Sequence, residues 1–152
     1  MANSQAMATS FKGELLNAYH NFSATNPART INTADSFKAA LYLASASMGA
    51  ATAAYSATNE VTGTGYTAGG VAITSWNAPT TAGTTGYTTP TASITYTSVT
   101  RTTAFDAVLI YNNTQGNRAV SVHTFGSQTV TAGTFTLTMP VNAAGTALIN
   151  IA

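Results

Sequence analysis

The chain has 152 residues, a formal net charge of +1 and only 6% charged residues, against about 25% in an ordinary soluble domain. Its length fits one domain, and its seven Tyr, six Phe and one Trp exclude a disordered chain. Because so few charges do little to keep molecules apart, this composition indicates a subunit that assembles with itself or docks onto a partner.

Several further classes are excluded by what the sequence lacks. The chain has no Cys, so disulfides and thiolate metal sites are ruled out. Residues 1–12 lack the basic start and apolar run of a secretory signal, and no stretch approaches the roughly 18 apolar residues of a membrane span. We therefore expect a soluble protein that is made in a cytoplasm and does not contact a membrane.

Residues 10–22 predict a helix, with Ser10 as its N-cap. Apolar residues recur there at three- and four-residue spacing, namely Phe11, Leu15, Ala18, Tyr19 and Phe22. We expect an N-terminal arm and helix over residues 1–22 and a single β-sandwich domain over residues 23–152. The side chains that we assign to an assembly interface are Phe11, Leu15, Tyr19 and Phe22. The helix can dock on its own sheet or on that of a neighbouring copy, because both bury this face equally well.

The middle of the chain alternates between strand and loop signals. A loop over residues 25–35 leads into a predicted strand over residues 37–44. The alanine-rich residues 45–58 suit a short helix or a compact loop. Four glycines over residues 63–70 predict tight turns before a strand at residues 71–74.

Residues 75–93 consist mostly of Thr, Gly, Pro and Ala, so they predict an exposed loop or an edge hairpin. The large side chains in this part of the chain are Trp76 and Tyr87, and Tyr66 precedes them in the glycine-rich turns. We expect Tyr66, Trp76 and Tyr87 to be exposed loop residues that are available for contacts.

From residue 93 onward the pattern is that of short strands. The predicted strands lie at residues 94–96, 105–111, 120–124, 134–139 and 148–151, with turns at 112–117 and 131–133. This spacing predicts a mainly β fold, an antiparallel β-sandwich with a short N-terminal helix. The candidate core residues are Phe37, Leu41, Phe105, Leu109, Tyr111, Val120, Val122, Phe135 and Leu137.

Threonine occupies many of the alternate strand positions, and this has two interpretations. Threonine has a high β propensity and suits exposed strand positions. Neutral hydroxyls also allow a sheet surface to pack against another subunit without burying charges. The low total charge favours adding the second interpretation to the first.

The sequence offers few groups for catalysis. Glu14 and His20 are six residues apart on the predicted helix, which places them on different faces and makes His20 a surface or cap residue. Asp106 and His123 lie in neighbouring predicted strands and could form a structural hydrogen bond, but no nucleophile motif accompanies them. We therefore expect no enzyme activity.

Ligand and nucleic-acid sites are also not indicated. Two His and four carboxylates without ligand spacing predict no metal site, and the glycine cluster at residues 63–70 lacks the spacing of a phosphate-binding loop. The five basic residues are scattered, so no basic stripe is available for nucleic acid. We expect no cofactor and no nucleic-acid partner.

Three segments carry a resemblance to a known group of proteins. They are FKGELLNAYHNF at residues 11–22, FKAALYLASASMGAATAAYSATNEVTGTGYTAGGVAIT at 37–74 and FDAVLIYNNTQGNRAVSVHTFGSQTVTAGTFTLTM at 105–139. The most specific parts are SATNEVTGTGYTAGG and LIYNNTQGNRAV. Together they resemble a widespread family of small structural proteins of tailed bacteriophages. Residues 75–100 depart from this resemblance, and nothing is transferred to them.

The resemblance implies a non-enzymatic virion protein that is synthesised in the host cytoplasm. Our leading hypothesis is a capsid decoration (cement) protein, a homo-oligomer, expected to be a trimer, that bridges subunits of the major capsid protein. The alternative is a tail or tail-fibre-associated component that contacts tail proteins and host surface glycans through Tyr66, Trp76 and Tyr87. A depolymerase is the weakest hypothesis, because glycosidic cleavage normally needs two positioned carboxylates.

Overall fold

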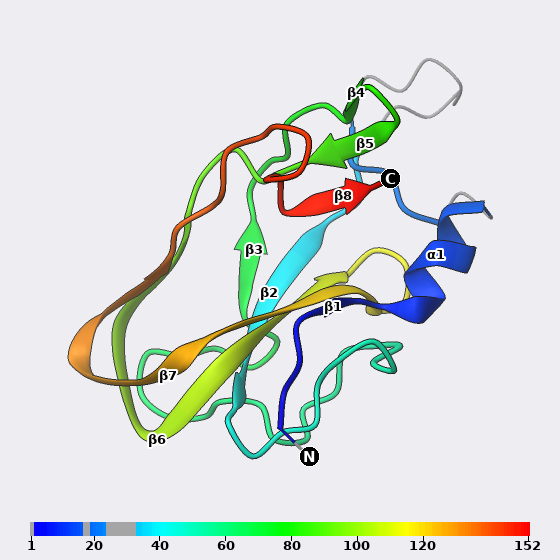
Figure 1. Cartoon of the computed structure of the whole chain (residues 1–152). Coiled ribbons are helices and arrows are strands. Elements are labelled where there is room, and N and C mark those ends of the chain that lie inside the picture. The colour runs from blue at the N-terminus through cyan, green and yellow to red at the C-terminus, as the bar shows by residue number, and fades with distance from the viewer. Residues whose placement is uncertain (1, 17–18, 24–32) are drawn as a thin grey trace.

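The computed structural model describes residues 2–16, 19–23 and 33–152. Its elements are β1 (Ala6–Met7), α1 (Thr9–Leu16), β2 (Phe37–Leu43), β3 (Val71–Ile73), β4 (Thr80–Ala82), β5 (Thr85–Thr88), β6 (Ile94–Asn112), β7 (Arg118–Leu137) and β8 (Ile149–Ile151). The larger antiparallel sheet has the strand order β1-β7-β6-β2-β3, and the smaller one has the order β4-β5-β8 (Figure 1). This confirms the predicted mainly β, antiparallel sandwich with a short N-terminal helix.

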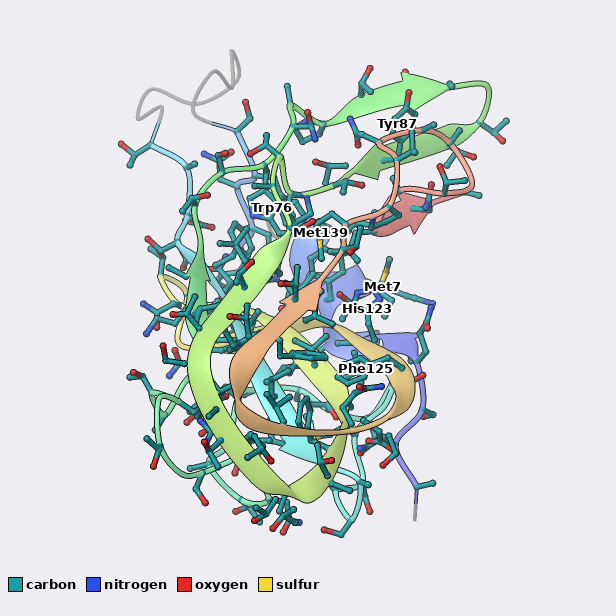
Figure 2. All side chains as sticks on the ribbon, turned by 90° about the vertical axis from the view of Figure 1, so that its left-hand side faces the viewer. Met7, Trp76, Tyr87, His123, Phe125 and Met139 are labelled. Carbon is teal, nitrogen blue, oxygen red and sulfur yellow. The ribbon has the colours of Figure 1, made fainter. Side chains whose placement is uncertain are left out.

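Two long strands, β6 and β7, dominate the larger sheet. They pair along most of their length, but the register shifts at five points, and the left-handed backbone of Ser98 and Ala132 lies in this irregular part. These irregularities let the two-stranded β6–β7 ribbon curl over the rest of the larger sheet (Figure 2). The Tyr96 hydroxyl then donates a hydrogen bond to the Ala39 carbonyl oxygen of β2 at 2.8 Å. The far half of the ribbon thereby supplies a second layer over the core.

The predicted turn at residues 131–133 is wrong, because β7 continues through it to Leu137. Ala132 has a φ of 47°, a value typical of turns, but the left-handed residue is accommodated within the strand where the register shifts. The strands predicted at residues 94–96 and 105–111 form one long strand, β6. Those predicted at 120–124 and 134–139 form another, β7.

The core lies between the two layers. Seven of the nine predicted core residues are buried, namely Phe37, Leu41, Phe105, Leu109, Tyr111, Val120 and Val122. Phe135 and Leu137 are only half-buried, because they lie on the curled end of β7, where the second layer reaches the edge of the molecule. The predicted strand at residues 37–44 forms β2, and the predicted hairpin forms β4 and β5.

The helix is shorter than predicted. α1 ends at Leu16, and residues 20–23 are not helical. Asn21 accounts for this locally, since its amide N–H donates to the Asp35 carboxylate at 2.9 Å and its side chain donates to the Thr33 carbonyl oxygen at 3.0 Å. Ala18 of the predicted apolar face and most of the predicted 25–35 loop fall outside the described residues. Residues 45–58 form turns, the compact-loop alternative.

Candidate assembly surface

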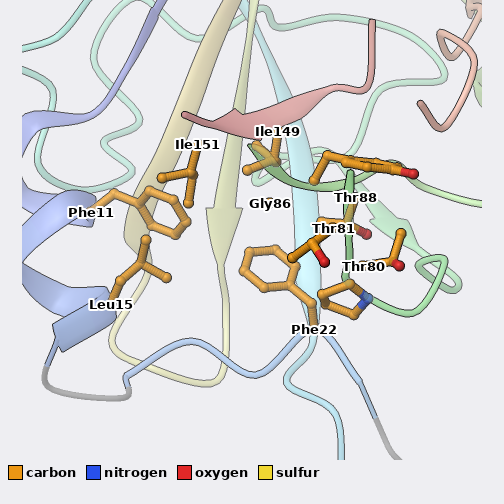
Figure 3. Close-up of a pocket in the computed structure, with 11 residues that line it drawn as sticks. Phe11, Leu15, Phe22, Thr80, Thr81, Gly86, Thr88, Ile149 and Ile151 are labelled. Carbon is orange, nitrogen blue, oxygen red and sulfur yellow. The ribbon is translucent and has the colours of Figure 1, made fainter. Parts of the chain in front are cut away.

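An apolar groove lies between α1 and the smaller sheet (Figure 3). It encloses about 260 Å³, and none of the described residues that line it is charged. Its apolar walls are built by Phe11, Leu15, Phe22, Tyr87, Ile149 and Ile151. The groove therefore combines segments from the two ends of the chain with the β4–β5 hairpin.

The helix and strand geometry explains which side chains form each wall of the groove. Phe11 and Leu15 are four residues apart on α1, which places them on the same face of the helix. Ile149 and Ile151 alternate along β8 and share one side of it. Opposite them, Gly86 of β5 lies in the middle of the groove, where the absence of a side chain leaves space (Figure 3).

A second hollow, of about 480 Å³, adjoins the groove and shares Leu15 and Ile151 with it. Lys12, Met7 and the C-terminal Ala152 line this hollow, and Lys12 is exposed. Ile151 is 44% exposed, so a large apolar side chain faces solvent where the two hollows meet.

A polar cluster, buried except for the Arg118 side chain, holds α1 against the end of β6 and β7. Arg118 Nη1 donates to Glu14 Oε1 at 2.6 Å, and His20 Nε2 lies 2.7 Å from Glu14 Oε2. The Asn112 side-chain amide donates to His20 Nδ1 at 3.1 Å and to Asp35 Oδ2 at 2.8 Å. His20 Nδ1 is thus an acceptor, which places the ring proton on Nε2, facing Glu14.

The expectation that His20 is a surface or cap residue is therefore wrong. His20 is buried and contacts Glu14, which the sequence placed on another face of a longer helix. α1 ends at Leu16 and His20 lies outside it, so helical geometry does not separate the two residues. The ring of Phe11 packs on His20, with 4.7 Å between the ring centroids.

The four predicted interface residues do not form one exposed face. Phe11 is completely buried within its own chain, and Leu15 and Phe22 are half-buried along the groove. Tyr19 points elsewhere: it is 40% exposed, with the Arg118 guanidinium 4.4 Å from its ring centroid. In this structure α1 packs on its own sheet, and only part of the predicted apolar face remains accessible.

The expectation that Tyr66, Trp76 and Tyr87 are exposed loop residues is also wrong, since all three are half-buried. Trp76 packs edge-on against the rings of Phe22 and Phe37, with centroid distances of 4.9 and 5.3 Å. Tyr87 is paired within the smaller sheet and lines the groove. Figure 2 shows Trp76 near the middle of the molecule and Tyr87 on the smaller sheet, so they do not form a shared platform.

Tyr66 belongs to a buried cluster around Glu60. Its hydroxyl donates to Glu60 Oε1 at 2.7 Å, Tyr55 donates to Oε2 at 2.6 Å, and the Gly69 N–H donates to Oε1 at 2.7 Å. Burial, together with the hydrogen bond to the Glu60 carboxylate, raises the pKa of both Tyr55 and Tyr66 well above the usual value. Sequence reasoning missed this cluster, because Glu60 lies in a loop and has no motif around it.

Two more buried tyrosines surround the same loop. The Tyr111 hydroxyl donates to the Gly69 carbonyl oxygen at 2.8 Å, and the Tyr42 hydroxyl donates to the Ser56 carbonyl oxygen at 2.5 Å. Burial raises the pKa of each phenol to about 12. The donors around Glu60 are directed inward to carboxylate and carbonyl oxygens, so this cluster anchors the 55–70 loop to the sheet.

The Asp106–His123 hydrogen bond that neighbouring strands would allow does not form. The β6–β7 register pairs His123 with Val108, and the Asp106 carboxylate accepts a hydrogen bond from the Asn3 side chain at 2.5 Å. His123 Nε2 instead lies 2.8 Å from the Ser121 hydroxyl, and Ser121 is only 3% exposed. Burial lowers the pKa of His123 to about 4, so the ring is neutral at physiological pH.

The described residues contain no group of three or more His, Asp or Glu side chains placed to hold a metal ion. No helix in this part of the chain is long and apolar enough to cross a membrane. In comparisons with known proteins, no family model, no curated protein and no solved structure matches this chain.

Proposed function

We propose that this chain is a non-enzymatic structural protein of a bacteriophage particle, a capsid decoration protein that bridges capsid subunits. The observation that carries the assembly role is the uncharged apolar groove between α1 and the smaller sheet. The phage assignment rests on the sequence resemblance of residues 11–22, 37–74 and 105–139.

The use of the carboxylates supports a structural role. All four are within the described residues, and each accepts hydrogen bonds from its own chain. Glu14 and Glu60 are mostly buried, and their oxygens already accept hydrogen bonds that hold the fold together.

The surface of the β6–β7 ribbon supports docking onto another protein. Its exposed side chains include Thr95, Thr97, Thr129, Thr131, Thr134 and Thr136. Residues 119–139 contain no charged residue and no proline, and Arg101, the charged residue within residues 93–104, is buried. A capsid subunit can cover such a surface without the cost of burying unpaired charges.

No observation favours the alternative of a tail component that contacts host glycans. That hypothesis relied on exposed Tyr66, Trp76 and Tyr87, and their side chains pack within the chain. Glycan contact would need aromatic rings that are free to stack on a sugar.

Cryo-electron microscopy of the phage particles that encode this chain tests the proposal. We expect density for the chain over the shell, at the junctions between capsid subunits. Density confined to the tail would replace decoration with a tail role, and absence from the particle would overturn the virion assignment.

A pair of variants tests the docking surface itself. Thr134→Lys adds a charge to the exposed face of β7, whereas Thr84→Lys adds the same charge to the exposed β4–β5 turn. We expect the first to reduce incorporation into particles and the second to leave it unchanged. Equal incorporation of both variants would show that the ribbon does not face the capsid.

A further inference from the structure

We propose that Arg101 binds a carboxylate from outside this chain, an Asp or Glu side chain of the capsid subunit on which the β6–β7 ribbon docks. The source of this carboxylate rests on the proposed function, whereas the site rests on Arg101 itself. Arg101 is only 3% exposed, although its guanidinium carries a full positive charge. Burying a charge is costly unless an opposite charge and hydrogen bonds compensate it.

The hydrogen bonds that Arg101 makes within the chain use one nitrogen of its guanidinium. Nη1 donates to the Thr64 carbonyl oxygen at 2.9 Å and also to the Thr100 carbonyl oxygen. Nε and Nη2 are buried and have no hydrogen-bond partner. These two nitrogens share one edge of the planar group, where their N–H groups point side by side. Such an edge fits both oxygens of a carboxylate, as in a bidentate arginine ion pair.

No carboxylate side chain of this chain supplies the opposite charge. All four Asp and Glu side chains are among the described residues, and none lies within ion-pair distance of Arg101. Glu60 accepts hydrogen bonds from two tyrosines and the Gly69 N–H instead. The ring of Tyr66 compensates part of the charge, because its centroid lies 5.1 Å from Arg101 Cζ. Burial nevertheless lowers the pKa of the guanidinium, so we look for its anion outside the chain.

Arg101 lies in the surface that we propose for docking. It is the charged residue of residues 93–104, and residues 119–139 of the paired strand contain none. Its neighbours Thr102 and Thr103 are exposed. The surroundings are therefore neutral, so one ion pair at Arg101 would fix the position of the partner on an otherwise uniform threonine surface.

A short exposed turn, residues 62–65, lies over the guanidinium. A Cβ added at Gly63 would be 2.8 Å from Arg101 Nη1, which shows how closely the turn approaches this group. The Thr64 carbonyl oxygen attaches the turn to β6, since it also accepts a hydrogen bond from the Thr100 N–H at 3.2 Å. Nε and Nη2 are closed to solvent, so either the turn or the guanidinium shifts when a carboxylate binds.

Solution NMR of the purified chain tests the site without a capsid. The Nε–H signals of the three arginines are followed during titration with sodium acetate, and sodium chloride at the same concentrations is the control. We expect the Arg101 signal, identified by its loss in Arg101→Lys, to shift and saturate with acetate alone. An Arg101 signal that acetate moves no more than chloride does would overturn the inference.

The stability of the isolated chain gives a second test. Arg101→Met keeps a long side chain and removes the unpaired charge, so we expect its midpoint in urea to exceed that of the wild type. Arg118→Met is the matched control, because Arg118 already pairs with Glu14 at 2.6 Å and its loss should lower the midpoint. A lower midpoint for Arg101→Met would show that the contacts of Nη1 compensate the buried charge, which contradicts the need for an outside carboxylate.

Incorporation into phage particles tests the source of the carboxylate. Arg101→Lys keeps the charge but lacks the two parallel N–H groups, whereas Arg118→Lys can still pair with Glu14. We expect Arg101→Lys to reduce incorporation at least about tenfold, the loss of one hydrogen bond between charged groups, and Arg118→Lys to leave it unchanged. Equal incorporation of the two variants would exclude a capsid carboxylate even where the wild type decorates the shell. A wild-type chain that is absent from the shell would overturn the proposed function, while the acetate titration still decides whether Arg101 is a carboxylate site.

Discussion

Gly86 and Ile151 are directly paired across β5 and β8, and the groove is open beside this pair (Figure 3). Ile151 supplies an apolar wall, while Gly86 supplies no side chain to fill the space in front of it. The groove is therefore a consequence of which residue stands opposite which in a three-stranded sheet.

Filling this space should stabilise the folded chain. We expect Gly86→Val to raise the free energy of unfolding by about 0.5–1.5 kcal/mol, because it restricts the unfolded backbone and buries apolar surface. Urea denaturation at a concentration where the chain is monomeric measures this. Gly126→Val, on the exposed part of β7, should gain less, since its side chain stays in solvent. A lower midpoint for Gly86→Val than for the wild type would contradict the open groove.

Phe11 attaches the helix to the rest of the fold. Its ring is completely buried and contacts the rings of His20 and Phe22. We expect Phe11→Ala to cost about 3–5 kcal/mol of unfolding free energy. Tyr19→Ala, at an exposed position near the same helix, should cost about 1 kcal/mol or less. Similar losses for the two variants in thermal denaturation would show that the helix is not docked as described.

Glu60 should be the most sensitive carboxylate for stability. Glu60→Gln leaves an amide group facing the donors of Tyr55, Tyr66 and Gly69, so at least one of them loses its acceptor. We expect a loss of about 1–3 kcal/mol, measured by urea denaturation. Asp106→Asn, which replaces a half-buried carboxylate outside this cluster, is the comparison and should cost less.

His123 should make the fold less stable in acid. The folded chain takes up this proton only near pH 4, whereas the unfolded chain takes it up near its ordinary pKa of 6.5. Between these values the unfolded state binds more protons, so stability falls as the pH falls. Relative to His123→Gln, the wild type should lose up to about 3 kcal/mol between neutral pH and about pH 4. Parallel stability curves for the two proteins would show that His123 does not have this lowered pKa.

Local patterns were enough to predict the fold class and the positions of β2, β3 and β8, but not the continuity of β6 and β7. The alternation and apolar run from Phe37 to Leu43 predict β2 to within one residue, because side chains alternate between the two faces of a strand. The composition of residues 75–93 predicts an exposed loop or an edge hairpin, and β4 and β5 form a hairpin there. Ala132 shows the limit of such signals: its left-handed backbone suits a turn, but the long-range pairing of β7 with β6 continues past it.

Composition and short-range spacing establish a sparsely charged, mainly β chain with few titratable groups. Those properties depend on composition and on neighbours a few residues apart. Long-range packing brings His20 against Glu14, turns Tyr66 inward to Glu60, and makes Phe11 and Ile151 two walls of one groove. The groove depends on residues about 140 positions apart, and the two inward contacts depend on how short loops fold back against the sheet. Periodicity carries no information about either, because it reports which face of an element is buried and not what that face meets.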